Sequence, residues 1–388
     1  MATPEKILAI AKYLKERTAT GEKLVVVVSA MGKNTDHLLS LAHALSDTPD
    51  LREMDQLLSV GEQTTIALLA IALKELGVAA RSFTASQAKI ATIGLHTKSR
   101  IESIDGQKLK DAFQTIDVAV VAGFQGVNDL GDTTTLGRGG SDTSAVALAA
   151  TLETKAEIYT DVNGVYSTDP RIYKYAKKID RISYDEMMEM SALGAKVMEM
   201  RSVELGKKYG VPIYVGQTLS SGGGTWIVAA DSSMEQQVIS AVALNDKILS
   251  ISVVGASPRY QEVAEIFQIL GRHHINVDMI CRSDLEDQAS LSFTIPLEEK
   301  GIFQKAAQEV SQVFPSLSFD IRDDYAKLSV VGIGMRDASG VAADLFSLFR
   351  SEHIPFHQIT TSEISISFTL PKSDSTRAVE RVCEKYDL

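Results

Sequence analysis

This sequence has few cysteines, and neither a long apolar run nor a signal-like start is expected in it. Its two cysteines, Cys281 and Cys383, cannot form a disulfide framework. We therefore expect a protein of the reducing cytoplasm in which both cysteines are small packed residues. The longest apolar runs, such as Leu24 to Val28, are far too short to cross a bilayer. Pro4-Glu5-Lys6 leads a charged amphipathic pattern in place of the apolar core of a signal peptide.

The sequence also has fewer positively charged than negatively charged residues. The 39 lysines and arginines stand against 50 aspartates and glutamates, which gives a net charge of -11, and no basic run occurs. We therefore expect no nucleic-acid partner and no membrane partner, but small molecules or copies of the chain. A hydrophobic content of 45% and a charged content of 23% are typical of a globular protein. The 388 residues suffice for two or three domains.

The most informative stretch runs from Asp117 to Asp142, DVAVVAGFQGVNDLGDTTTLGRGGSD. Val118 to Ala122 has the length and the β-branched content of a strand buried on both faces. Gly137-Arg138-Gly139-Gly140 then leads to Ser141, the expected N-cap of a helix over Asp142 to Thr154. Glycines admit a ligand close to the backbone, and a helix start and Arg138 both attract anions. The pattern predicts a phosphate or carboxylate site, and the alternative is a tight turn with a helix cap.

The chain before this stretch alternates helices with strands. Thr3 and Pro4 are expected as the N-cap and first residue of a helix, and Leu24 to Val28 as a buried strand. Small polar residues follow that strand, among them Ser29 and Thr35, and such positions bind ligands in α/β folds. Thr35 could instead simply cap the helix over Leu38 to Leu45. A long helix is predicted over Asp55 to Leu76, with Glu62 early in it, beside Gly61; the alternative is a solvated glutamate in the first turn.

A further strand, Glu157 to Val162, leads into a second candidate loop, Thr160 to Arg171. Asp161, Tyr166 and Arg171 gather just beyond the carboxyl end of this strand, where ligands bind in open α/β sheets. The alternative is a hairpin-like loop marked by Asn-Gly and Asp-Pro. Tyr184 to Tyr209 is predicted to be helical, with a break near Gly194, and it carries Lys196, which could equally be a solvated lysine. The alternation over about 230 residues predicts a largely parallel sheet covered on both faces.

The last 150 residues or so contain a repeat. Leu249 to Gly255 matches Leu328 to Gly332, Glu262 to Ile280 matches Gly340 to Ile359, and Leu291 to Pro296 matches Ile366 to Pro371. Each copy reads as strand, helix, strand and strand, followed by a helical pattern. The sequence therefore predicts a duplicated α+β module.

Five motifs carry a resemblance to a known family: SAMGKNTDHL, LSVGEQ, GFQGVNDLGDTTTLGRGGSDTSA, YTDVNGVYSTDPR and ALGAKVMEMRSVE. In order and approximate spacing they resemble aspartate kinase of the amino-acid kinase fold, and the repeat resembles its paired ACT domains. The implied fold class is α/β, an amino-acid kinase domain over 1–230 followed by ferredoxin-like ACT modules over 245–315 and 325–388. The implied reaction transfers the γ-phosphoryl of ATP to the β-carboxylate of L-aspartate, the committed step towards lysine, threonine and methionine.

The resemblance also implies site residues. Arg138, Asp142 and Glu62 would be catalytic, and no protein ligand is expected for the Mg²⁺ that accompanies the nucleotide. L-aspartate would be bound by Ser29, Thr35, Glu62, Arg138 and Ser141. ATP would be bound by Thr160, Asp161, Tyr166, Ser167, Thr168, Asp169, Pro170, Arg171 and Lys196. A lysine or threonine effector would be bound by Asn276, Val277, Asp278, Thr361, Ser362 and Glu363, within a homodimer or higher homo-oligomer formed through the ACT domains. The alternative for the effector residues is that they form turns of an interface domain.

One family feature is missing. Family members begin with a strand that ends in Lys-Phe-Gly-Gly, whose lysine neutralises the transferring phosphate, and this tetrapeptide does not occur here. Without it we expect Leu24 to Val28 to lack a neighbouring strand, and the rate to fall on the order of 100-fold or more. The alternative function is an amino-acid-sensing regulatory subunit or an inactive truncated form. Glutamate 5-kinase and uridylate kinase fit less well, because neither explains the repeat.

Overall fold

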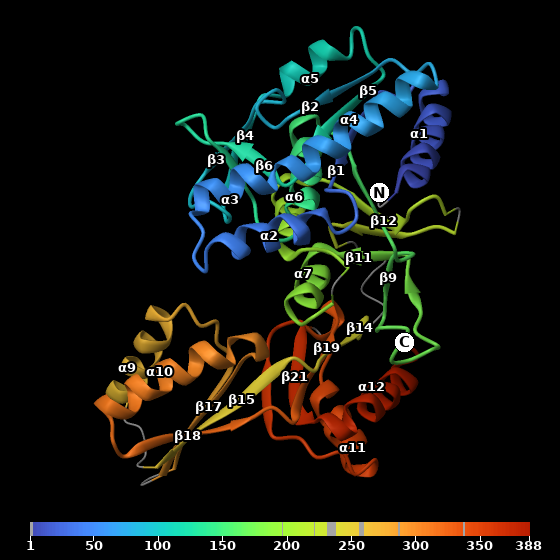
Figure 1. Cartoon of the computed structure of the whole chain (residues 1–388). Coiled ribbons are helices and arrows are strands. Elements are labelled where there is room, and N and C mark those ends of the chain that lie inside the picture. The colour runs from blue at the N-terminus through green and yellow to red at the C-terminus, as the bar shows by residue number, and fades with distance from the viewer. Residues whose placement is uncertain are drawn as a thin grey trace. The chain divides into compact units, whose positions relative to one another are not determined.

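The structure is a computed structural model that describes residues 3–195, 197–220, 222–230, 238–255, 260–285, 288–336 and 338–388 (Figure 1). The chain divides into two compact units. The first unit comprises Met1–Val165, Asp180–Met188 and Lys196–Ala230. The second unit comprises Tyr166–Ile179, Glu189–Ala195 and Asp231–Leu388.

The first unit opens with α1, Pro4–Ala19. The Lys6 N–H donates to the Thr3 hydroxyl over 3.4 Å, and Pro4 occupies the first helical turn, which confirms the predicted start. Ile7, Ala11 and Leu14 form the buried face of α1, which packs beside α4, Val60–Glu75 (Figure 1).

A parallel sheet of order β1-β5-β2 follows, formed by β1 (Leu24–Val28), β5 (Val118–Ala122) and β2 (Ala80–Phe83). Every residue of the central strand β5 is fully buried, as its apolar run predicts. β1 is only half-buried over most of its length, because it pairs with β5 on one side and no other described strand pairs with it.

The single helix predicted over Asp55 to Leu76 is wrong in its bounds. Two helices, α3 (Leu51–Leu58) and α4, meet at Ser59, after α2 (Asn34–Leu45). By length and composition, Leu51–Glu75 is the one described helical stretch that could cross a membrane. However, 56% of its apolar window is buried inside the fold, as in the core helix of a globular protein.

A small sheet is formed by the segments before and after β5. Its order is β4-β3-β6-β7, from β4 (Arg100–Ile104), β3 (Ile90–Ile93), β6 (Gln125–Val127) and β7 (Thr133–Thr135). The hairpin of β3 and β4 is followed by α5, Gly106–Ala112. β7 leads through the glycine-rich turn into α6, Gly140–Thr151.

The rest of the first unit's sheet structure is mixed. The order is β11-β13-β12-β8, from β11 (Arg181–Ser183), β13 (Thr225–Val228), β12 (Ile213–Gln217) and β8 (Ala156–Thr160). β12 runs parallel to β8 but antiparallel to β13, so the sheet departs from the all-parallel pattern. The other elements between β8 and β12 are β9 (Val165–Tyr166), β10 (Lys178–Ile179), α7 (Tyr184–Ala192) and α8 (Met200–Tyr209).

The second unit contains the duplicated module (Figure 1). The first copy contributes β15 (Ile248–Gly255), α9 (Tyr260–Arg272), β16 (Asp278–Leu285), β17 (Gln288–Pro296) and α10 (Lys300–Val313). The second copy contributes β19 (Tyr325–Val331), α11 (Val341–Ser351), β20 (Gln358–Thr361), β21 (Ser365–Pro371) and α12 (Lys372–Tyr386). Short 3-10 turns, η2 (Leu297–Glu299) and η3 (Ile333–Arg336), complete these elements.

Each module has a fourth strand that the repeat did not reveal. The first sheet, β16-β17-β15-β18, adds β18 (Leu317–Arg322). The second sheet, β14-β19-β21-β20, takes β14 (Ala241–Asn245) from the chain ahead of the first copy. Both modules have buried phenylalanines in their cores, Phe293 and Phe303 in the first module and Phe349 and Phe368 in the second. Cys383 is buried in the second core, as expected of a packed cysteine.

Candidate active site

The glycine-rich loop meets β1 where β5 ends. A Cβ atom on Gly123, the residue after β5, would lie 2.8 Å from Val27 Cγ1 and 2.9 Å from Ser141 Oγ. Both distances are too short for a real Cβ, so a glycine is needed for this close approach. The start of α6 therefore packs against the strand ends of the parallel sheet.

Ser141 is not the N-cap of α6, and that prediction is wrong. Gly139, with a φ of 66°, is the N-cap, and the helix begins at Gly140. Ser141 is the second helical residue, and its hydroxyl accepts a hydrogen bond from Ser29 over 2.8 Å. The glycine takes the cap position because the chain must turn through the left-handed region there.

Glu62 is a buried carboxylate with one oxygen unsatisfied. Its side chain is 3% exposed, and Oε1 accepts the Ala30 N–H over 2.9 Å. Oε2 has no hydrogen-bond partner among the described residues. Burial raises the pKa of Glu62 to about 7. The alternative of a solvated first-turn glutamate is therefore wrong.

Two hydrogen bonds gather three predicted residues at one place. Glu62 bonds to Ala30, and Ser141 bonds to Ser29, the residue before it. Gly61 permits the first contact, since a Cβ there would lie 2.7 Å from the Cβ of Ala30. The structure thus brings together the start of α4, the end of β1 and the start of α6.

Asp142 follows Ser141 and is half-buried. Burial, and secondly the charge of Glu199, raise the pKa of Asp142 to about 6. Glu199 precedes α8 and packs directly on Gly139, where a Cβ would overlap its side chain. Glu199 lies within the motif ALGAKVMEMRSVE, but it is 57 positions from Asp142 in the chain, and only the fold brings the two carboxylates together.

Arg138 is exposed between two glycines of positive φ, Gly137 at 79° and Gly139 at 66°. Its guanidinium forms no hydrogen bond or ion pair with any described residue, so it is available to an anionic ligand. Thr35 lies in the first turn of α2, whose N-cap is Lys33, so the alternative of Thr35 as a helix cap is wrong. Among the described residues, no hydrogen bond or ion pair joins Thr35 or Arg138 to the Glu62 cluster, which consists of Glu62, Ala30, Ser29 and Ser141.

The residues predicted for ATP fall in both units. Thr160 ends β8, and its hydroxyl lies 2.6 Å from the Asp161 N–H and 2.9 Å from Asp161 Oδ1. Asp161 is exposed at this strand end. Tyr166 to Arg171 belong to the second unit. Lys196 lies outside the described residues.

Within the second unit, the loop residues differ in how they are engaged. Ser167 is 2% exposed and its hydroxyl accepts the Lys177 N–H over 3.0 Å, which is a structural bond. The Thr168 hydroxyl is buried and has no partner among the described residues. The Arg171 guanidinium donates to Asp169 over 2.6 to 3.1 Å and lowers the pKa of that carboxyl. Tyr166 is half-buried and Pro170 is exposed.

The effector residues also lie in the second unit. Asp278 is exposed and accepts a hydrogen bond from the buried ammonium of Lys327, a partner that the sequence did not suggest. The Asn276 N–H donates to Glu299, and Val277 is half-buried. Thr361, Ser362 and Glu363 are exposed, and Glu363 pairs with Arg336 over 2.7 Å.

Residues 1–217 match the amino acid kinase family, and residues 328–386 match the ACT domain. Aspartokinase 2 of Bacillus subtilis (strain 168) is 42% identical over 386 residues, which cover 99% of this chain and 94% of that protein. The chain belongs to the aspartokinase family. Its kinase class and its amino-acid kinase fold with C-terminal ACT structure, predicted from the motifs, are thereby confirmed.

Solved structures of relatives agree with this family assignment. E. coli aspartokinase III in complex with aspartate and ADP, described as the R-state, matches with a TM-score of 0.72 and 26% identity, over 92% of this chain and 80% of the relative. The same enzyme in complex with lysine and aspartate, described as the T-state, matches with a TM-score of 0.72 and 26% identity, over 91% and 80% of the two chains. The chain therefore shares its fold with a relative that was crystallised with aspartate and ADP and with lysine and aspartate.

Proposed function

We propose that the chain phosphorylates the β-carboxylate of L-aspartate with ATP, forming 4-phospho-L-aspartate. The relative crystallised with aspartate and ADP supports these two substrates. A carboxylate is ionised at neutral pH and attacks phosphorus without a general base. The protein's task is therefore to position the two substrates and to neutralise their charge.

The aspartate would bind between Arg138 and the Glu62 cluster. The free guanidinium of Arg138 can pair with a substrate carboxylate through two parallel hydrogen bonds. The unsatisfied Glu62 Oε2 can accept from the substrate ammonium, which would supply the partner that this buried atom lacks. Ser29, Ser141 and Thr35 offer hydroxyls to the same substrate.

Phosphoryl transfer would take place at the N-terminus of α6. The backbone N–H groups of this first turn and Arg138 favour anions, and Asp142, in the same turn, would lie beside the reacting groups. ATP would be held by Thr160, Asp161, the loop from Tyr166 to Arg171, and Lys196. Mg²⁺ would be bound to the nucleotide phosphates and largely coordinated by water, and we name no protein ligand for it.

Regulation would act through the domains over 245–315 and 325–388. The relative crystallised with lysine supports an amino-acid effector. In this chain the effector would bind at Asn276 to Asp278 and at Thr361 to Glu363. We assign the reaction to the first step towards lysine, threonine and methionine, in a cytoplasmic homodimer or higher homo-oligomer. An effector that favours a weakly binding state with a coupling of roughly 1–3 kcal/mol would inhibit the enzyme.

The observation that carries the proposal is the buried Glu62 carboxylate, with one oxygen unsatisfied, joined through Ser29 and Ala30 to the anion-binding start of α6. The test is to incubate the purified chain with ATP, Mg²⁺ and L-aspartate in hydroxylamine, which converts an acyl phosphate into a coloured hydroxamate. We expect hydroxamate and ADP in equal amounts, and neither with L-glutamate in place of aspartate. Absence of hydroxamate, together with calorimetric binding of lysine or threonine, would support the regulatory-subunit alternative instead.

A further inference from the structure

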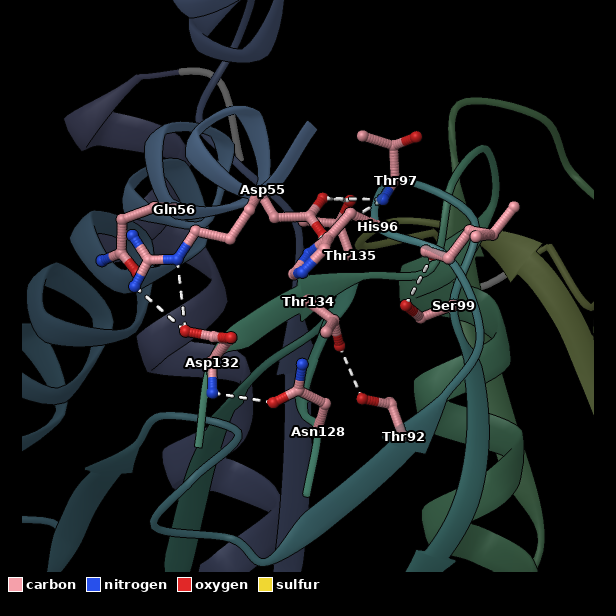
Figure 2. Close-up of polar contacts among 12 residues, drawn as sticks. Asp55, Gln56, Thr92, His96, Thr97, Ser99, Asn128, Asp132, Thr134 and Thr135 are labelled. Atoms are coloured by element: carbon pink, nitrogen blue, oxygen red, sulfur yellow. Dashed lines mark hydrogen bonds and ion pairs between the residues drawn. The ribbon is translucent and has the colours of Figure 1, made fainter. Parts of the chain in front are cut away.

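A second buried carboxylate, Asp55, lies in the same unit and outside the proposed substrate-binding set. Its side chain on α3 is 0% exposed. The Thr97 N–H lies 3.0 Å from both carboxylate oxygens, the Thr135 hydroxyl donates to Oδ1, and His96 Nδ1 lies 2.7 Å from Oδ2 (Figure 2). One side chain thus ties α3 to the loop between β3 and β4 and to the end of β7.

Thr97 is held in an unfavourable backbone conformation. Its φ is 67°, in the left-handed region that a β-branched residue rarely adopts. Such strain persists only where surrounding contacts fix the backbone, and it is concentrated at functional sites. The bond from the Thr97 N–H to both oxygens of Asp55 is the contact that fixes it here.

The residues held by Asp55 adjoin the turn that carries Arg138. A Cβ on Gly137 would lie 3.1 Å from the Thr97 carbonyl oxygen, so the Thr97 backbone lies directly against this turn. The Ser99 N–H donates to the Thr135 carbonyl over 3.0 Å. Arg201 then donates to the carbonyls of Leu136, over 3.1 Å, and of Ser99, over 3.0 Å. Hydrogen bonds thereby hold the carbonyls of Thr135 and Leu136, and Gly137 lies against the Thr97 carbonyl. The Arg138 side chain forms no hydrogen bond or ion pair with any described residue.

We propose that Asp55 is a positioning residue for substrate binding, which holds the Thr97 loop and the end of β7 so that Arg138 is presented to the substrate carboxylate. This inference rests on the proposed function, in which Arg138 binds aspartate. Asp55 acts through the backbone and touches neither substrate. Its loss therefore weakens aspartate binding and leaves ATP binding unchanged, whereas a purely stabilising contact would affect the folded fraction alone.

The chain offers a matched pair of threonines for the test. Thr135 and Thr134 are neighbours on β7 and both are 1% exposed, but the Thr134 hydroxyl bonds to Thr92 over 2.6 Å instead of to Asp55 (Figure 2). Thr135→Val and Thr134→Val make the same chemical change on one strand. Thr135→Ser keeps the hydroxyl, and Asp55→Asn removes the charge. KM for aspartate, KM for ATP, kcat and the melting temperature are measured for each variant.

We expect Thr135→Val and Asp55→Asn to raise KM for aspartate about tenfold, the effect of losing a hydrogen bond to a charged group, with KM for ATP changed less than twofold. Thr135→Ser should restore the wild-type KM for aspartate. Thr134→Val should keep that KM even if its melting temperature falls as far as that of Thr135→Val.

If the wild-type chain is active, either of two results overturns the inference. The first is an unchanged KM for aspartate in Thr135→Val, and the second is a rise in KM for aspartate in Thr134→Val that equals the rise in Thr135→Val. If the wild-type chain forms no hydroxamate but binds aspartate in calorimetry, the dissociation constants replace KM in the same comparison. A wild-type chain that neither reacts with nor binds aspartate refutes the proposed function and this inference together. If Asp55→Asn does not fold, the threonine variants still decide, because valine and threonine are nearly equal in shape.

Discussion

The hydroxyl groups of Ser29 and Ser141 share a hydrogen bond of 2.8 Å across 112 positions of the sequence. Ser29 follows β1 and Ser141 belongs to the first turn of α6, so this bond joins the end of β1 to the N-terminus of α6, where phosphoryl transfer is proposed. The absence of a side chain at Gly123 leaves room for it.

Gly123→Ala should therefore destabilise the first unit and impair activity. The added methyl group would crowd Val27 and Ser141, and overpacking of this kind costs about 1–3 kcal/mol. Gly271→Ala is the control, since its Cβ meets no atom within 4 Å and lies in α9, where alanine should stabilise the helix by up to about 1 kcal/mol. Urea unfolding of both variants measures the difference, and equal stability of the two would contradict the packing argument.

Arg138→Ala should raise KM for aspartate about 10- to 100-fold, because the variant loses a bidentate pair with the substrate carboxylate. KM for ATP should change much less. Arg81→Ala, which removes another exposed arginine on β2, serves as the control for a general loss of positive charge. Steady-state kinetics with each substrate varied in turn would measure both KM values. An unchanged KM for aspartate in Arg138→Ala would contradict the placement of Arg138 in the substrate site.

Glu62 should make aspartate use depend on pH. If the substrate ammonium binds the ionised carboxylate, kcat/KM for aspartate should fall up to tenfold per pH unit below the pKa of about 7, since a group that must be ionised is then protonated. In Glu62→Gln, kcat/KM should be lower and this titration should disappear. A pH profile between 5.5 and 8.5 is the measurement, and a wild-type profile without this limb would count against the role.

The same carboxyl should affect stability in the opposite direction. Its pKa of about 7 in the folded chain exceeds the ordinary value of 4.5, so the folded state binds more protons between these pH values. The stability contributed by the protonated, buried form is therefore lost as pH rises from about 4.5 to about 7. Glu62→Gln should be more stable than wild type at pH 8, by up to about 3 kcal/mol, and nearly equal at pH 4.5. Denaturant unfolding at the two pH values tests this, and a pH-independent difference would contradict it.

Glu199→Gln should lower the pKa of Asp142. Burial is the main reason that this pKa stands at about 6, and the charge of Glu199 is the second, so removing the charge should return the pKa part of the way to 3.8. Carbon-13 NMR of the carboxyl groups can follow the titration, with Asp142→Asn to identify the resonance. An unchanged midpoint would mean that Glu199 does not act on Asp142 through its charge.

Local signals predicted local structure well. Thr3 and Pro4 start α1 as expected, because capping depends on neighbouring residues alone. Ser141 was assigned a cap that Gly139 takes, because the serine hydroxyl finds a tertiary partner in Ser29, which lies far away in the sequence. β14 and β18 were missed for a similar reason, since the pairing of a short strand is decided by its distant neighbours.

The candidate site was predicted in part. Motifs led to Glu62 and Arg138, but burial and the unsatisfied oxygen of Glu62 became visible only in the fold. Asp55 lay outside every motif, although one signal was present. It lies beside Met54 and before Leu58, both buried, and a carboxylate on the apolar face of a helix needs fixed polar partners. Those partners come from β7 and the loop after β3, so the sequence could suggest burial but not the partners.

The position of β14 has a consequence for how the C-terminal modules can be separated. The sheet of the second module is completed by Ala241–Asn245, so the whole first module, from Ile248 to Arg322, is inserted between two adjacent strands of its neighbour. A fragment that starts at Tyr325 would expose the hydrogen-bonding edge of β19 and would tend to aggregate. The first module could be excised as a continuous segment. The second module cannot be obtained intact from any segment that begins after the first module, because such a segment lacks β14.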